Sequence, residues 1–167
     1  MSQRSVIFDP FKFAAEGRQV SGRVAVGDLA RLSDVLFDAE GEVSYQVIGD
    51  QALDGPSMLR IEAHGVLHLC CQRCLGALSW PVSISPVLQL VRPGAPIPDD
   101  ELEEDGYDAV EASAEMDVLA LVEDELLLAL PVAPRHDVCE APRPLGGDQK
   151  KSPFAVLAGL NKRSDVQ

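Results

Sequence analysis

The middle of the chain has the sequence SMLRIEAHGVLHLC (residues 57–70), CCQRCLG (70–76) and LSWPVSISPVLQLV (78–91). The two longer stretches are rich in apolar and β-branched residues, which is typical of β-strands. The stretch between them is short and contains glycine and polar residues, which favour a tight turn. We therefore expect a β-hairpin that carries the sequence CQRC at its turn.

Two further strands are expected upstream of this hairpin. Residues 18–26 (RQVSGRVAV) alternate apolar and polar side chains, and residues 42–49 are also strand-like. Between them, Asp28 is placed to cap a short helix through Phe37, because apolar residues recur there at helical spacing. Consecutive strands with short connections favour an antiparallel sheet, and the helix would cover one face of it.

The net charge of −13 comes from one part of the chain. Thirteen Asp and Glu residues and no basic residue lie between Pro93 and Pro134, while acids and bases balance elsewhere. The simplest interpretation is a solvated loop that keeps the protein soluble. The alternative is a surface that contacts a basic protein, because a local acidic strip leaves the rest of the surface free to meet a polyanion.

The second half of the acidic stretch is expected to form a helix. Asp117 can cap DVLALVEDELLLAL, which Pro131 ends. Leu119, Val122, Leu126 and Ala129 or Leu130 would line its apolar face, with Glu123, Asp124 and Glu125 towards the other face. A third, short helix is expected after Ser152, with the apolar residues Phe154, Val156, Leu157 and Leu160 docked on the protein's own core or on a partner.

These elements predict an α+β fold, with an antiparallel, curled or barrel-like sheet, flanking helices and a mobile acidic loop at about 93–116. Residues 1–140 would form one domain, and 141–167 would add a loop and the short helix. The 167 residues are 46% hydrophobic but only 5% aromatic, which predicts an aliphatic core. No apolar run is long enough to span a bilayer and the start lacks a signal core, so we expect a cytoplasmic protein without a membrane partner.

The four cysteines are expected to be thiols, because nothing indicates secretion. Cys71 and Cys74 form a CxxC pair, and His136 and Cys139 form an HxxC pair about sixty residues later. Two such pairs can complete one tetrahedral Zn²⁺ site if the two segments meet. The alternative is a hairpin turn with buried or reactive thiols.

Two kinds of catalysis by these residues are disfavoured. A thioredoxin-like redox pair needs its first thiol at a helix N-terminus, whereas CQRC precedes a strand-like stretch. Nucleophilic catalysis by a cysteine with His136 and Asp137 lacks any recognisable oxyanion-binding element. We therefore expect neither kind of catalysis from these residues.

Arg73 lies at the tip of the predicted hairpin, and Arg135 directly precedes His136. If the two segments meet, both guanidinium groups would form a small basic spot that can bind phosphates. The alternative is that both are ordinary solvent-exposed residues. The few aromatic residues show no motif for base-specific recognition of single strands.

Several stretches resemble the YceD family of bacterial proteins, which is associated with accumulation of large-subunit ribosomal RNA. They are FDPFKFAAEGRQVSGRVAVGDL near the start, CQRC, DVLALVEDELLLALPVAPRHDVCE, and SPFAVLAGL near the end. The resemblance covers nearly the whole chain. Cys71, Arg73 and Cys74 match the family's CxRC. Glu123, Asp124 and Glu125 match its acidic helix, and Pro131, Pro134, His136 and Cys139 match the loop that follows. The short HDVC departs from relatives, and Cys70 is an additional thiol.

This resemblance implies a non-enzymatic factor in large-subunit biogenesis that supports processing or accumulation of 23S ribosomal RNA. The expected partners are 23S rRNA or a precursor of the large subunit, together with a basic ribosomal protein, and not DNA. Arg73, Arg135, Glu123, Asp124 and Glu125 are the candidate RNA- or partner-binding residues. The alternative function is a small zinc-binding or thiol-based regulatory protein that acts on RNA only indirectly.

Overall fold

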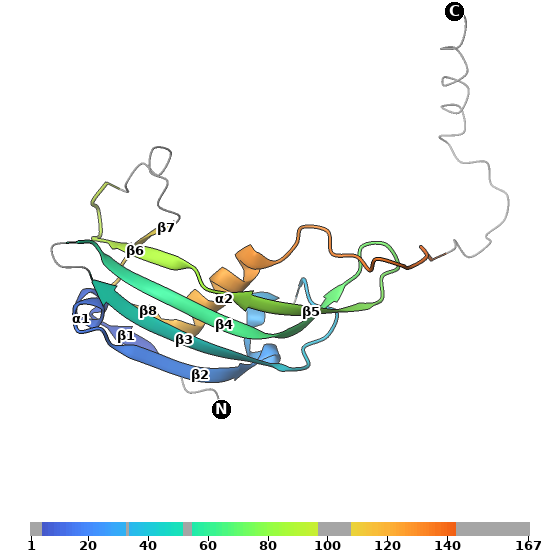
Figure 1. Ribbon diagram of the computed structural model, residues 1–167, viewed down its shortest axis with the longest axis horizontal. Coiled ribbons are helices and arrows are strands. Elements are labelled where there is room, and N and C mark those ends of the chain that lie inside the picture. The colour runs from blue at the N-terminus through green and yellow to red at the C-terminus, as the bar shows by residue number, and fades with distance from the viewer. Residues whose placement is uncertain (1–4, 33, 52–54, 97–107, 143–167) are drawn as a thin grey trace, which may run out of the picture.

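A computed structural model describes residues 5–32, 34–51, 55–96 and 108–142, and it confirms the α+β class (Figure 1). These residues form two helices and eight strands, with two short 3₁₀ turns, η1 and η2, between β2 and β3. In chain order the elements are β1 (Val6–Phe8), α1 (Pro10–Ala15), β2 (Gln19–Ala25), η1 (Val26–Asp28), η2 (Ala30–Leu32), β3 (Glu42–Gln51), β4 (Ser57–Cys70), β5 (Ala77–Ile84), β6 (Val87–Val91), β7 (Asp108–Glu111), β8 (Glu115–Asp117) and α2 (Val118–Ala129).

The long strand β4 organises the main sheet, whose strand order is β2-β3-β4-β6-β7. One edge of β4 pairs with β3, and its other edge pairs with β6 near the start of β4 and with β5 near its end. The expected hairpin is confirmed, because β4 and β5 are antiparallel and Cys70 pairs with Ala77 across the turn. The predicted strand over 78–91 is instead two strands. Pro86 lies between them and has no N–H to donate to a continuous ladder.

Three parts of the predicted sheet need correction. β6 and β7 pair in parallel, whereas every other pairing in the main sheet is antiparallel. The described strands do not close into a barrel, because β2 and β7 remain as edges. The segment 93–116, predicted as a loop, contains β7 and the start of β8. The edge of β6 has backbone N–H and C=O groups that need hydrogen-bond partners, and β7 supplies these partners. Residues 97–107, at the centre of the predicted loop, lie outside the described residues.

The helix predicted over 28–37 is also wrong. The segment forms η1 and η2 and then approaches the end of β4, where the N–H of Phe37 donates to the carbonyl of His68 at 2.6 Å. Leu29 and Leu32 are buried and Leu36 packs against the core, but Val35 is exposed, so the apolar pattern marks core residues only in part. Bonds from these backbone amides to distant parts of the chain replace a continuous helical ladder.

One face of the main sheet is buried, and it carries the aliphatic core. Alternate residues of β3 and β4 point into it, as the two-residue period of a strand requires. α1 packs against β3 and β4, and α2 packs against β4 and β5 (Figure 1). The largest fully buried side chains are Leu29, Leu32, Leu59, Ile61, Leu67, Leu69, Leu126, Val26, Val43, Val47, Val118 and Val122.

α2 begins as predicted. The Asp117 carboxylate accepts hydrogen bonds from the N–H groups of Leu119 and Ala120, at 2.9 and 3.2 Å. Val122 and Leu126 are fully buried, and Pro131 follows the last helical residues. Within the described ranges, no helix is long and apolar enough to cross a membrane. The helix predicted after Ser152 lies outside the described residues.

Candidate metal centre

Two segments far apart in sequence meet beyond the end of the sheet. The turn between β4 and β5 lies beside the loop that follows α2 (Figure 1). The N–H of Gln72 donates to the carbonyl of Pro134 at 2.8 Å, which joins the two backbones directly. We call residues 71–76 and 134–139, taken together, the loop junction. The structure therefore brings together the CxxC and HxxC pairs of the sequence.

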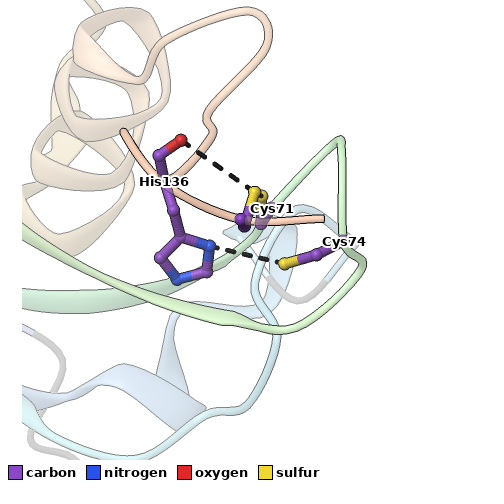
Figure 2. Close-up of side chains that lie close together, drawn as sticks. Cys71, Cys74 and His136 are labelled. Carbon is purple, nitrogen blue, oxygen red and sulfur yellow. Dashed lines mark hydrogen bonds between the residues drawn. The ribbon is translucent and has the colours of Figure 1, made fainter. Parts of the chain in front are cut away.

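Four side chains converge in the loop junction: Cys71, Cys74, His136 and Cys139. One possible ligand atom from each lies within 4.8 Å of the others. The sulfurs of Cys71 and Cys139 are 3.8 Å apart, and the sulfur of Cys74 is 3.4 Å from Nδ1 of His136. Figure 2 shows the His136 ring and the Cys74 side chain pointing towards each other. Cys70 is a free thiol that does not belong to this group.

The turn that holds the first two cysteines is closed by backbone bonds. The N–H of Leu75 donates to the carbonyl of Cys71, and the N–H of Cys71 donates to the carbonyl of Gly76, both at 2.9 Å. Leu75 has a φ of 61°, a left-handed conformation that is uncommon for a side chain other than glycine. The tight turn carries both sulfurs of the CxxC pair to the same cluster.

The backbone also favours a thiolate at Cys71. The N–H of Cys74, with smaller contributions from the N–H groups of Arg73 and His136, lowers the pKa of the Cys71 thiol to about 5, although burial opposes this. Burial raises the pKa of Cys139, and the nearby Cys71 and Cys74 sulfurs raise it further. A cation bound among the sulfurs would compensate this accumulation of negative charge.

His136 is oriented for coordination. Its Nε2 lies 2.9 Å from the carbonyl oxygen of Ala77. A carbonyl can only accept, so Nε2 carries the proton and Nδ1 keeps a free lone pair directed at the cluster. Metal-binding histidines are commonly oriented by such a bond from the second ring nitrogen.

Two separations between ligand atoms of the cluster are close to those around a tetrahedral ion. Zinc bonds of about 2.3 Å to sulfur and 2.05 Å to nitrogen separate two sulfurs by about 3.8 Å and a sulfur from a nitrogen by about 3.6 Å. The observed separations are 3.8 Å for Cys71 and Cys139 and 3.4 Å for Cys74 and His136. Three sulfurs and one imidazole nitrogen are also the donor types of structural zinc sites. These four residues could therefore hold a metal ion.

Arg73 and Arg135 lie on the two segments of the loop junction, and both are exposed. Arg73 stands between the two cysteines of the turn, and Arg135 directly precedes His136. Among the described residues, neither forms an ion pair with a carboxylate. Their role in binding stays a prediction, and the structure joins the two segments that carry them.

The acidic residues of α2 have different surroundings from those expected. Glu123 is only 8% exposed, so its predicted position on the outer face of the helix is wrong. Its carboxylate accepts from the N–H of Arg31 at 2.7 Å, the N–H of Leu32 at 3.3 Å and Nε of Arg31 at 2.9 Å. Asp124 is exposed and pairs with another nitrogen of the same guanidinium.

Arg31 is a structural residue that sequence reasoning missed. Its guanidinium also donates to the carbonyl of Ala120 at 3.0 Å. Hydrogen bonds to Glu123, and secondarily to Asp124, raise the pKa of Arg31 above its ordinary value. An isolated arginine in an apolar stretch carries no signal for a partner ninety-two residues away. Glu123 and Asp124 thus have an intramolecular role, and their binding to another molecule stays a prediction.

Glu125 has no such cationic partner among the described residues. Partial burial, followed by the nearby carboxylates of Asp108 and Asp124, raises its pKa. Its predicted role in partner binding is untested.

The sequence also gave no indication of a pair between His68 and Asp38. Nδ1 of His68 lies 2.8 Å from the Asp38 carboxylate, which also accepts from the N–H of Glu40 at 3.0 Å. The N–H of Glu40, and then His68, lower the pKa of Asp38. This pair ties the segment after η2 to the end of β4.

The sequence is similar to known proteins. Residues 59–161 match the model of the family described as large ribosomal RNA subunit accumulation protein YceD, a range that contains all four cluster residues. The chain is 31% identical to the large ribosomal RNA subunit accumulation protein YceD of Haemophilus influenzae, over 93% of this chain and 94% of that protein. No solved structure matches the chain. The family match and the near full-length similarity together show that the chain belongs to the YceD family.

Proposed function

We propose that this protein is a non-enzymatic factor for accumulation of the large ribosomal subunit RNA, and that it binds 23S rRNA or an assembly intermediate. Family membership supports the general role, because the relative in Haemophilus influenzae is named for it. The observation that carries the binding mode is the loop junction. It presents Arg73 and Arg135 on two segments joined by a direct backbone bond.

The two arginines suit contact with a phosphate backbone. Both are exposed, and within the described part of the chain neither is neutralised by an ion pair. A guanidinium can bind a phosphate through two parallel hydrogen bonds. Such contacts position a protein on RNA without reading bases, so binding should be sensitive to salt.

A Zn²⁺ ion held by Cys71, Cys74, His136 and Cys139 would be a structural ion. Four protein ligands close a tetrahedral site and leave no open position for a substrate or a water nucleophile. This closed donor set supports a non-enzymatic role. The ion would fix the HxxC segment on the CxxC turn and thereby fix the relative position of the two arginines.

We further propose that the acidic stretch between Pro93 and Pro134 contacts a basic ribosomal protein in the cytoplasm. Asp108 and the partly exposed Glu125 lie close enough for one carboxylate to raise the pKa of the other. Clustered carboxylates are favourable towards a cationic partner, which would relieve their mutual repulsion. Deleting residues 97–107 should reduce co-purification with a ribosomal protein. Unchanged co-purification would leave this segment as a solubilising loop.

Charge reversal tests the RNA contact. The full-length variant Arg73→Glu/Arg135→Glu should crosslink to 23S rRNA at least about fivefold less than wild type, because two phosphate contacts become repulsive. Arg60→Glu is the matched control, since Arg60 is an exposed arginine of β4 outside the loop junction.

Three results would contradict this proposal. Undiminished crosslinking of the double variant would remove the loop junction from the RNA site. An equal loss with Arg60→Glu would indicate non-specific attraction to the whole surface. Crosslinking only to a protein, with RNA contacts absent for the wild type, would favour the regulatory alternative that meets RNA indirectly.

A further inference from the structure

A largely apolar groove of about 340 Å³ lies beside the loop junction. Its lining includes residues of four segments: Val35 before β3, Leu69 and Cys70 at the end of β4, Leu130 at the end of α2, and Val132 in the following loop. Gln72 and Pro134, whose backbones join the two halves of the loop junction, also line it. The groove is therefore built by the same contact that assembles the candidate metal centre.

The groove has exposed apolar side chains of a kind that is usually buried. Val132 is 103% exposed and Val35 is 44% exposed. Contiguous exposed apolar surface usually marks a binding site in a soluble protein. None of the described residues that line the groove is basic, while the acidic residue Asp34 is part of its lining.

We propose that this groove binds the chain's own C-terminal segment, residues 154–160 (FAVLAGL). Phe154, Leu157 and Leu160 recur every three residues, which would place them along one side of a helical turn. The family match extends to residue 161 and so includes this segment. A seven-residue apolar segment cannot hold a helix alone in water and needs a surface on which to pack.

The length of the chain allows the segment to return to the groove. The described residues end at Pro142, three residues after Cys139 of the loop junction. Eleven residues lie between Pro142 and Phe154, and this connection can span up to about 40 Å when extended.

Charge complementarity favours this occupant. Residues 143–167 contain five Lys and Arg residues and two Asp residues, in a protein whose overall net charge is −13. Lys162 and Arg163 follow the apolar segment after one intervening residue, Asn161. They would lie near the carbonyl end of α2 and the carboxylate of Asp34, both of which attract positive charge.

Cys70 reports on whether the groove is covered, because it lines the groove and is not one of the four cluster residues. Alkylation of Cys70 in the full-length protein can be followed by peptide mass spectrometry. The variant Phe154→Ala/Leu157→Ala should be modified at Cys70 at least about tenfold faster than wild type, because the segment no longer protects the groove. Val166→Ala, which removes apolar volume outside the segment, should leave the rate unchanged. Equal rates in wild type and the double variant would overturn the proposal.

A second variant tests the groove itself. Val35→Gln should accelerate Cys70 modification as the double variant does, whereas Val66→Gln should not. Val66 is 48% exposed, similar to Val35, but it lies on β4 and does not line the groove. If protection in wild type increases with protein concentration, a second copy supplies the segment and the intramolecular proposal is wrong. If protection appears only when ribosomal particles are added, the occupant is a partner and the proposal is equally wrong.

Discussion

Nδ1 of His136 lies 3.4 Å from the sulfur of Cys74, a residue sixty-two positions earlier in the chain. The other nitrogen of the same ring donates to the carbonyl of Ala77, at the start of β5. The hairpin therefore supplies both a neighbouring thiol and the group that orients the imidazole. A histidine held in this way is prepared for coordination before any ion binds.

Zinc content should depend on the cluster cysteines and not on their neighbour. We expect about one zinc per chain in the purified protein, and loss of that zinc in Cys71→Ser or Cys74→Ser, because each removes one of four ligands. Cys70→Ser is the matched control and should keep full zinc content. Elemental analysis measures all four proteins. Wild-type protein that holds no zinc after purification without chelators would show that the cluster consists of free thiols.

Metal removal should separate the two halves of the loop junction. Without the ion, the backbone bond between Gln72 and Pro134 and the bond from His136 to the carbonyl of Ala77 must hold the 134–139 segment. Hydrogen exchange of residues 71–76 and 134–139 should therefore increase after chelation, while β3 stays protected in the core. Exchange that rises equally in β3 would indicate global unfolding, and unchanged exchange at the loop junction would show that no ion supports it.

Glu123 should be the most important acidic residue of α2 for stability. Glu123→Ala leaves the N–H groups of Arg31 and Leu32 without their acceptor and removes the main partner of the guanidinium. We expect a loss of about 2–4 kcal/mol in the free energy of unfolding. Asp124→Asn should cost at most about 1 kcal/mol, because this pair is exposed. Equal losses in urea denaturation would contradict the structural role of Glu123.

Glu125 should destabilise the protein slightly at neutral pH. Folding raises the pKa of Glu125 above its ordinary value of 4.5. The folded state therefore binds this proton more tightly than the unfolded state, which adds to the free energy of unfolding below pH 4.5. This addition is lost as the pH rises through the folded pKa. Glu125→Gln should therefore raise the free energy of unfolding at pH 7 by about 0.5 kcal/mol or less, since the group is partly screened by solvent.

The pH dependence separates this effect from a general effect of net charge. The gain from Glu125→Gln should shrink towards zero below pH 4.5, where the wild-type carboxyl becomes protonated. Glu62→Gln removes an equal charge on strand β4 instead of helix α2 and serves as the control. A gain that is constant from pH 4 to 7, measured by denaturation, would be inconsistent with the raised pKa.

Gly49 should not tolerate a side chain. A Cβ atom there would lie 2.6 Å from the carbonyl oxygen of Phe13 and 2.7 Å from Cα of Ala14, both backbone atoms of α1. Gly49→Ala must displace α1 from β3 and should cost about 1–3 kcal/mol in thermal or chemical denaturation. Gly27→Ala is the control, because its new Cβ would make ordinary contacts at 3.6 Å or more, and it should cost about 0.5 kcal/mol or less. Equal costs would show that α1 is not held closely against β3.

The hairpin, the α2 cap and the turn of the CxxC pair could be predicted because they depend on neighbouring residues. Alternation along residues 57–70 and the carboxylate of Asp117 act within a few positions. The pairing of CxxC with HxxC could be anticipated as chemistry, since four zinc-type ligands are present. That the CxxC and HxxC segments meet in space could not be predicted, because their spacing along the chain does not specify whether two loops come together.

Long-range competition for hydrogen bonds decided the remaining features. The segment after Asp28 has a helical apolar pattern, yet its amides bind Glu123 and the end of β4. The same bonds turn Glu123 inward, against the polar pattern of its helix. β7 pairs in parallel because the chain returns beside the free edge of β6.

Periodicity and capping are encoded locally, since they depend on residues within one or two turns of each other. The inward carboxylate, the parallel strand and the assembled cluster each require two segments to be brought together from far apart. Many partners are available in the sequence to each buried hydrogen-bond donor or acceptor. The packed tertiary structure selects one of them, because all buried donors and acceptors must form hydrogen bonds in the same three-dimensional arrangement.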